Sequence, residues 1–191
     1  MYHEFPATYH HLIESNDHVV FLETSKFDNE NYRSYLFLDP ITILSIYNIE
    51  EVDALLESIE QYLKDGYYVA GYFAYECGFA FEKIAAFLPS QTQIAFFGIY
   101  KRPLIFNHRT GVFENQKTEI PQRAFIPSPF HLITPALEIS KEDYLQNIET
   151  IITHIKAGNT YQINFTSSYD FDAHGSPLSF YHSLKNKQRV S

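Results

Sequence analysis

The stretch that decides most about this chain covers residues 140–165 and reads SKEDYLQNIETIITHIKAGNTYQINF. Ser140 stands where a helix N-cap belongs, Asp143 takes the place of the capping-box acid, and Gly158 stands where a helix ends. Between them, apolar residues recur every three or four positions. This pattern predicts an amphipathic helix whose buried stripe consists of Tyr144, Ile148, Ile151, Ile152 and Ile155.

The residues after Gly158 alternate between apolar and polar side chains, which predicts a strand. Apolar residues at 161, 163 and 165 share one face of this strand, while Gln162 and Asn164 share the other. Side-chain amides offer both donors and acceptors, so these two residues could contact a polar ligand. A solvated strand face has the same composition, and the pattern supports both interpretations equally.

Upstream, the sequence predicts short strands over residues 18–24, 33–38, 41–47, 67–75, 93–100 and 102–107. Residues 50–64 have helical periodicity and end at Asp65-Gly66. A further helix is expected to begin at Ser176-Pro177. No crossover helix separates the first three strands, so we expect an antiparallel meander and an α+β fold class.

Composition limits the classes of function that the chain can have. The formal net charge is −9 in 191 residues, which argues against nucleic acid or an anionic membrane as a partner but leaves an anionic substrate open. The single cysteine, Cys77, excludes an internal disulfide and is typical of a reducing cytosol. We expect it to be a buried structural residue. No apolar run approaches the ~20 residues of a membrane span, and with no apolar leader segment a cytoplasmic location is expected.

Few residues indicate chemistry by themselves. His10-His11 invites a metal interpretation, but neighbours on a strand would point to opposite faces and chelate poorly. Glu76 and Glu82 lie among aromatic residues, where a carboxyl group could act as an acid, although a surface position is the commoner role. Glu23 ends an apolar strand beside a hydroxyl and could accept a ligand ammonium group; a solvated carboxylate is the simpler interpretation.

Four stretches together resemble component I of the aminodeoxychorismate (para-aminobenzoate) synthases and the related large component of anthranilate synthases, enzymes that use chorismate. Residues 21–24 (FLET) resemble a Leu-Leu-Glu-Ser element, with Thr24 in place of the usual Ser. Residues 32–37 and Asp39-Pro40 resemble the following strand. Residues 71–82 (GYFAYECGFAFE) favour the para-aminobenzoate branch. Residues 157–164 (AGNTYQIN) match an Ala/Ser-Gly-Asp-x-Tyr-Gln-Val-Asn signature, with Asn159 in place of Asp.

The resemblance implies a fold of antiparallel β-sheets packed face to face with flanking helices, of which this chain covers the N-terminal part. Residues 1–130 would form the N-terminal region of that fold, and residues 131–191 the truncated start of its chorismate-binding region. In the family, the N-terminal strands carry a tryptophan pocket. Leu22, Glu23, Thr24 and Ser34 map onto or near its wall.

The activity that the resemblance implies is conversion of chorismate and ammonia to 4-amino-4-deoxychorismate, with ammonia from a glutamine amidotransferase partner and with Mg²⁺ as cofactor. The chain contains no Pro-Ile-Lys-Gly-Thr motif, which carries the family's catalytic lysine. We therefore assign no catalytic or metal-binding residue, and we expect a fragment that is inactive alone. The alternatives are a non-catalytic tryptophan-binding or docking module and a fragment of an anthranilate synthase.

Overall fold

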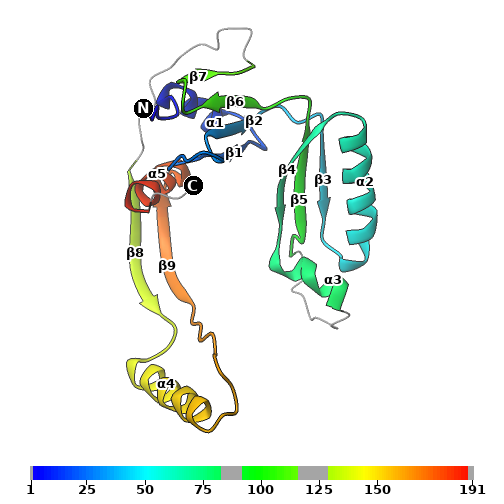
Figure 1. Ribbon diagram of the computed structural model, residues 1–191. Coiled ribbons are helices and arrows are strands. Elements are labelled where there is room, and N and C mark those ends of the chain that lie inside the picture. Colours follow the sequence, from blue (N-terminus) through cyan, green and yellow to red (C-terminus); the bar gives the residue numbers. More distant parts are fainter. Residues whose placement is uncertain (1, 83–91, 116–128, 189–191) are drawn as a thin grey trace. The chain divides into compact units, whose positions relative to one another are not determined.

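The computed structural model describes residues 2–82, 92–115 and 129–188, which fold as two compact units (Figure 1). The first unit comprises Met1–Ile126 with Lys185–Ser191, and the second comprises Pro127–Leu184. The predicted boundary between residues 130 and 131 refers to regions of a family fold rather than to contact-defined units, and it stays a prediction.

The first sheet of the first unit is built from four antiparallel strands in the order β1-β2-β6-β7. The strands are β1 (Val20–Leu22), β2 (Arg33–Phe37), β6 (Leu104–Asn107) and β7 (Val112–Phe113). One face of this sheet packs Leu36 and Phe106 against Phe5 and Tyr9 from the N-terminal segment. That segment continues through η1 (Ala7–Tyr9) into the short helix α1 (His10–Ser15), so the N-terminus covers this face of the sheet.

The second sheet has the order β3-β5-β4 and is also antiparallel. Its strands are β3 (Thr42–Ile46), β4 (Tyr68–Phe73) and β5 (Ala95–Tyr100). The helix α2 (Val52–Lys64), preceded by η2 (Ile49–Glu51), lies along this sheet (Figure 1). A capping box between Asn48 and Glu51 starts the helical turn.

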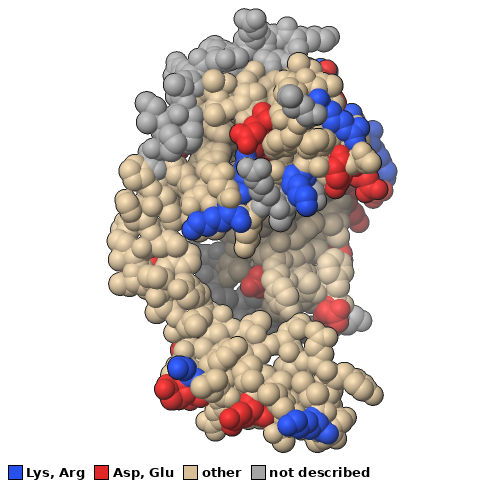
Figure 2. Space-filling view, turned by 60° about the vertical axis from the view of Figure 1, so that its left-hand side comes forward, with Lys and Arg blue, Asp and Glu red and all other residues tan. Residues whose placement is uncertain are grey.

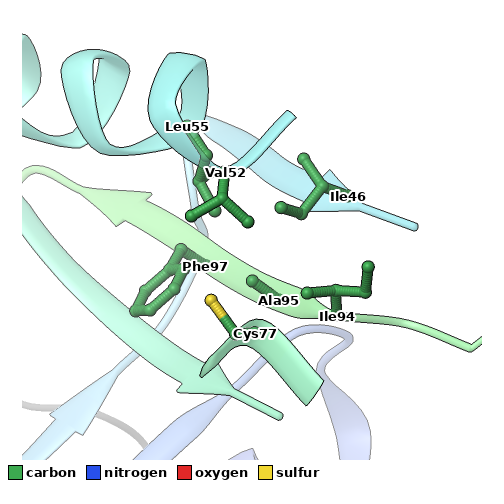
Figure 3. Close-up of a cluster of buried hydrophobic side chains, with 7 residues drawn as sticks. All are labelled: Ile46, Val52, Leu55, Cys77, Ile94, Ala95 and Phe97. Carbon is green, nitrogen blue, oxygen red and sulfur yellow. The ribbon is translucent and has the colours of Figure 1, made fainter. Parts of the chain in front are cut away.

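The core between α2 and this sheet is apolar and closely packed (Figure 3). The turn η3 (Tyr75–Gly78), followed by α3 (Phe79–Glu82), contributes Cys77. The cluster consists of Ile46, Val52, Leu55, Cys77, Ile94, Ala95 and Phe97. Cys77 is 5% exposed and free, which confirms that it is a buried structural residue.

The two sheets meet through the opposite face of the second sheet. Phe37 from β2 packs with Ala70 and Tyr100 from β4 and β5, and Tyr35 lies beside them. The α+β class with antiparallel sheets is therefore confirmed. The expected three-strand meander is wrong in one respect, because β3 pairs with β5 rather than with β2. Asp39 has a φ of +52° and precedes a proline, so the chain turns out of the first sheet at this point.

The second unit contains one antiparallel strand pair, β8 (Phe130–Leu137) with β9 (Tyr169–Gly175), and two helices. The helix α4 (Lys141–Lys156) begins and ends as predicted: Ser140 Oγ accepts the Asp143 N–H at 3.0 Å, and Gly158 has a φ of +75°. The helix α5 (Pro177–Lys187) begins after Ser176 as predicted, and its residues from Lys185 onward belong to the first unit.

Two expectations for this unit are wrong. The apolar stripe of α4 is not buried: Ile148 and Ile151 are half-buried, and Tyr144, Ile152 and Ile155 are exposed. Residues 160–168, where a strand was expected, form no strand and pair with no described strand. Sequence analysis also missed β8 and β9. Pro135 within β8 argues against a strand, and Asp170 and Asp172 in β9 have low β-propensity.

Candidate functional site

The residues predicted to form the wall of an amino-acid pocket lie at and after the end of β1. Leu22 pairs with Tyr35 of β2 and is 54% exposed. The side chain of Glu23 is completely buried, and its Oε1 lies 2.6 Å from Nζ of Lys185, which belongs to the same unit. The carboxylate therefore already binds an ammonium group, supplied by the chain itself.

The hydroxyl groups of Thr24 and Ser34 are engaged in hydrogen bonds with neighbouring backbone and side-chain groups. Thr24 Oγ1 donates to the carbonyl of Arg33 at 2.9 Å, across the strand pair. The backbone N–H of Thr24 donates to Ser34 Oγ at 3.0 Å. Ser34 is fully buried. The structure thus places Thr24 beside Ser34 and Arg33, and these hydrogen bonds hold the end of β1 in place. The role of Leu22, Glu23, Thr24 and Ser34 as a pocket wall stays a prediction.

Sequence analysis missed His108, which lies directly after β6 and is fully buried. Its Nε2 lies 2.6 Å from Ser34 Oγ, and its Nδ1 lies 2.7 Å from the carbonyl oxygen of His3. Since a carbonyl only accepts, Nδ1 carries the proton and Nε2 accepts the hydroxyl proton of Ser34. Burial lowers the pKa of His108, although the hydrogen bond to the His3 carbonyl partly opposes this effect.

The Ser34–His108 distance is that of a nucleophile and its general base, but the arrangement does not suit catalysis. Both side chains have an exposed fraction of 0%, so a substrate cannot reach the hydroxyl group. In the sequence, His108 is marked only by its place directly after the predicted strand over residues 102–107. A turn histidine is ordinarily solvated, which is why the pattern gave no reason to select it.

The two amides of the signature segment lie in the second unit and are exposed. Gln162 Nε2 donates to Asn164 Oδ1 at 3.3 Å, so the two side chains contact each other. The segment that carries them is not a strand, and their role in contacting a polar ligand stays a prediction.

A cavity of about 510 Å³ opens in the second unit near the first turn of α4. Its walls carry two carboxylates, three hydroxyl-bearing residues and one apolar side chain, from Glu138, Ile139, Asp143, Thr166, Ser167 and Ser168. Asp143 also accepts a hydrogen bond from Ser140 Oγ at 2.7 Å. No lysine or arginine lines the cavity, so its charge disfavours a dicarboxylate ligand at this position.

The remaining candidates from the sequence show no constellation for chemistry. Glu76 is half-buried and Glu82 is exposed. His10 and His11 lie in α1 rather than on the strand considered above, and the buried His10 ring stacks on Phe5. Within residues 2–82, 92–115 and 129–188, no three His, Cys, Asp or Glu side chains are arranged to hold a metal ion.

The surface also bears on the choice of partner. On the face shown in Figure 2, basic side chains lie singly or beside acidic ones and form no continuous basic patch, which agrees with a chain of 23 acidic and 14 basic residues. In the part of the chain that the structure describes, no helix combines the length and the apolar composition that crossing a membrane requires.

Comparison with known proteins identifies a family for this chain. Residues 18–191 match the family described as chorismate binding enzyme. No curated protein matches the chain. Because the match covers most of the sequence, from just before β1 to its last residue, the chain belongs to the chorismate binding enzyme family.

Proposed function

We propose that this member of the chorismate binding enzyme family serves the synthesis of 4-amino-4-deoxychorismate in the cytoplasm, as the N-terminal portion of an aminodeoxychorismate synthase component I. In this reaction ammonia replaces the 4-hydroxyl group of chorismate, and water is the other product. A glutamine amidotransferase would supply the ammonia. The observation that carries the proposal is the family match over residues 18–191, combined with the residues 71–82 that favour this branch over anthranilate synthesis.

The structure gives a physical reason for one residue of that segment. Gly71 pairs with Phe97 in the β4–β5 ladder. A Cβ at this position would lie 2.7 Å from Phe97 Cα, and closer still to the Phe96 carbonyl oxygen. The glycine therefore permits a close approach of two strands. This close packing gives Gly71 a structural role within residues 71–82. It does not bear on which product the enzyme forms, which remains part of the proposal.

We assign no catalytic residue to this chain. The described residues contain no group of three side chains that could hold a metal ion, and the cavity beside α4 is lined by two carboxylates. We therefore derive no reaction step through Mg²⁺ here, and we propose that the reacting groups and the metal ligands of the enzyme lie outside residues 1–191. The contribution of this chain is structural: it supplies the two sheets of the first unit and residues 157–164, which match the family signature.

Two experiments test this proposal. The purified chain, incubated with chorismate, ammonia and Mg²⁺, should form no 4-amino-4-deoxychorismate. Product above a no-protein control would show that the reacting groups lie within residues 1–191, and would overturn the proposal that they lie outside this chain. The complete reading frame that contains the chain should restore growth of a strain that requires para-aminobenzoate. Restored growth of an anthranilate-requiring strain instead would place the enzyme in the other branch.

The tryptophan-type pocket stays a prediction. No specific contact favours it as a second function, since the carboxylate of Glu23 and the hydroxyls of Thr24 and Ser34 are engaged within the chain. Titration calorimetry of the chain with tryptophan tests it directly. Absence of heat at millimolar ligand would count strongly against the pocket.

A further inference from the structure

The backbone that follows β1 is held at Thr24 by two side chains. Ser34 Oγ accepts the Thr24 N–H at 3.0 Å, and the hydroxyl of Tyr2 donates to the Thr24 carbonyl at 3.2 Å. This residue lies beyond the last ladder pair of β1 and β2, which is Leu22 with Tyr35. Hydrogen bonds from side chains, rather than backbone pairing between strands, therefore hold the backbone at Thr24.

Both of these side chains rest on His108. Ser34 is joined to it by the 2.6 Å hydrogen bond at Nε2, and the Tyr2 ring stacks on the imidazole with a centroid distance of 5.1 Å and an interplanar angle of 6°. His108 also binds the N-terminal segment through two hydrogen bonds to the backbone of His3. Its backbone carbonyl accepts the His3 N–H at 3.0 Å, and its Nδ1–H donates to the His3 carbonyl at 2.7 Å.

The pattern of donors requires a neutral ring. The Thr24 N–H donates to Ser34 Oγ, so the Ser34 hydroxyl proton is directed to Nε2 of His108. If Nε2 of His108 carried a proton as well, that proton would point at Ser34 Oγ. The hydroxyl proton of Ser34 would then lose Nε2 as its acceptor, and the site is closed to solvent. An unpaired donor and a new charge in a buried position both disfavour this arrangement.

The groups that face the ring come from every neighbouring element. Glu23 and Lys185 act on its charge in opposite directions, because the carboxylate favours the added proton and the ammonium group opposes it. The ring also contacts three neutral groups, which are the phenol ring of Tyr2, the hydroxyl of Ser34 and the edge-on ring of Phe106. The net effect of burial is to lower the pKa of His108.

We propose that His108 is a positioning residue: its neutral Nδ1–H form joins the N-terminal segment at His3 to the Glu23–Thr24 backbone, and protonation releases both. This inference goes beyond the proposed function, because it concerns the order of a segment of the chain and does not depend on chorismate. A role in packing alone would not depend on the protonation state of the ring, which gives the proposal its test.

The first experiment uses the unaltered, ¹⁵N-labelled chain. At pH 7.5, the imidazole nitrogen resonances should show a proton on Nδ1 and none on Nε2. As the pH falls, the hydrogen-exchange protection factors of the His3 and Thr24 amides should decrease about tenfold, the effect of losing one buried hydrogen bond. This decrease should follow the titration of His108. The Ala74 amide, which donates to Ile94 in the other sheet, is the internal control and should not follow it.

The second experiment compares His108→Gln with His131→Gln, a matched change at an exposed histidine of β8. Without a titrating ring, the protection of His3 and Thr24 should be lower and independent of pH in His108→Gln, whereas His131→Gln should behave as the unaltered chain. If His108→Gln does not fold, the measurements on the unaltered chain decide.

Four results would overturn the proposal. The first is a proton on Nε2 instead of Nδ1 at pH 7.5. The second is unchanged protection of His3 and Thr24 while His108 titrates. The third is the same pH dependence in His108→Gln. The fourth is a ring that remains neutral at every pH at which the chain is folded.

Discussion

Replacing Gly98 by alanine should destabilise the first unit strongly. Gly98 lies in the middle of β5, on the face that meets the first sheet. A Cβ there would lie 2.6 Å from Cε2 of Tyr100 and closer still to its Cζ and Oη. The Tyr100 ring is fully buried, and its hydroxyl donates to the His18 carbonyl at 2.8 Å. The ring therefore cannot turn aside without losing both its packing and its hydrogen bond.

The expected cost follows from these two losses. Overpacking a well-packed core costs about 1–3 kcal/mol, and loss of the Tyr100 hydrogen bond adds about 1 kcal/mol. The free energy of unfolding should therefore fall by about 2–4 kcal/mol. Gly78→Ala is the matched control, because a Cβ at Gly78 meets no atom within 4 Å. Its effect should stay within about 0.5 kcal/mol.

Urea unfolding of the 191-residue chain measures both variants. The chain has 15 tyrosines and no tryptophan, so tyrosine fluorescence and far-UV circular dichroism are suitable probes. The double variant Gly98→Ala with Tyr100→Leu removes the ring that the new methyl group would meet, so its two changes should be non-additive. If Gly98→Ala is as mild as Gly78→Ala, or if the double variant is strictly additive, the packing described here is wrong.

Three further predictions concern the buried groups of the first unit. Ser34→Ala removes the acceptor of the Thr24 N–H and leaves His108 Nε2 without its donor, so the free energy of unfolding in urea should fall by about 1–3 kcal/mol. For the exposed control Ser45→Ala, it should fall by less than about 0.5 kcal/mol. Burial lowers the pKa of His108 in the folded chain, so as the pH falls the unfolded chain binds a proton at this residue before the folded chain does. The contribution of His108 to the free energy of unfolding is therefore complete above about pH 6.5 and is lost as the pH falls toward the lower pKa of the folded chain. A melting temperature that does not fall between pH 7.5 and 5.5, or falls equally in His108→Gln, contradicts this. Burial raises the pKa of the Cys77 thiol, so a thiol reagent should modify it slowly in the folded chain and rapidly in denaturant; equally rapid modification in both would disprove its burial.

Local signals in the sequence were sufficient for the elements that carry their own end markers. Ser140 and Gly158 bound α4 because a side-chain oxygen and a left-handed glycine satisfy the helix ends locally. The helix at residues 50–64 and most strands of the first unit were predicted for the same kind of reason. These features depend on residues close in sequence, which a single chain displays.

Long-range pairing was not predictable in the same way. The periodicity of residues 41–47 indicates a strand but not its partner, and the turn at Asp39 sends β3 to β5 instead of β2. The alternation of residues 161–165 indicates a half-buried strand, yet no described strand lies against them. A periodic pattern states which face is apolar, whereas the structure shows whether that face is covered.

The candidate site also combines residues that the sequence indicates with contacts that the sequence does not show. Leu22, Glu23, Thr24 and Ser34 were selected by resemblance, and Thr24 does lie beside Ser34. Their shared contacts could not be read from the sequence, because His108 is 74 positions from Ser34 and Lys185 is 162 positions from Glu23. A buried histidine after a strand has the same sequence signature as a solvated one in a turn.

We have proposed that this member of the chorismate binding enzyme family serves aminodeoxychorismate synthesis. This proposal is tested by expressing the reading frame that contains residues 1–191 and identifying the product that the encoded protein forms from chorismate, ammonia and Mg²⁺. Chromatography with mass detection should find 4-amino-4-deoxychorismate, and adding a lyase that removes pyruvate should convert it to para-aminobenzoate. Formation of anthranilate, or of any chorismate product without nitrogen, would contradict the account.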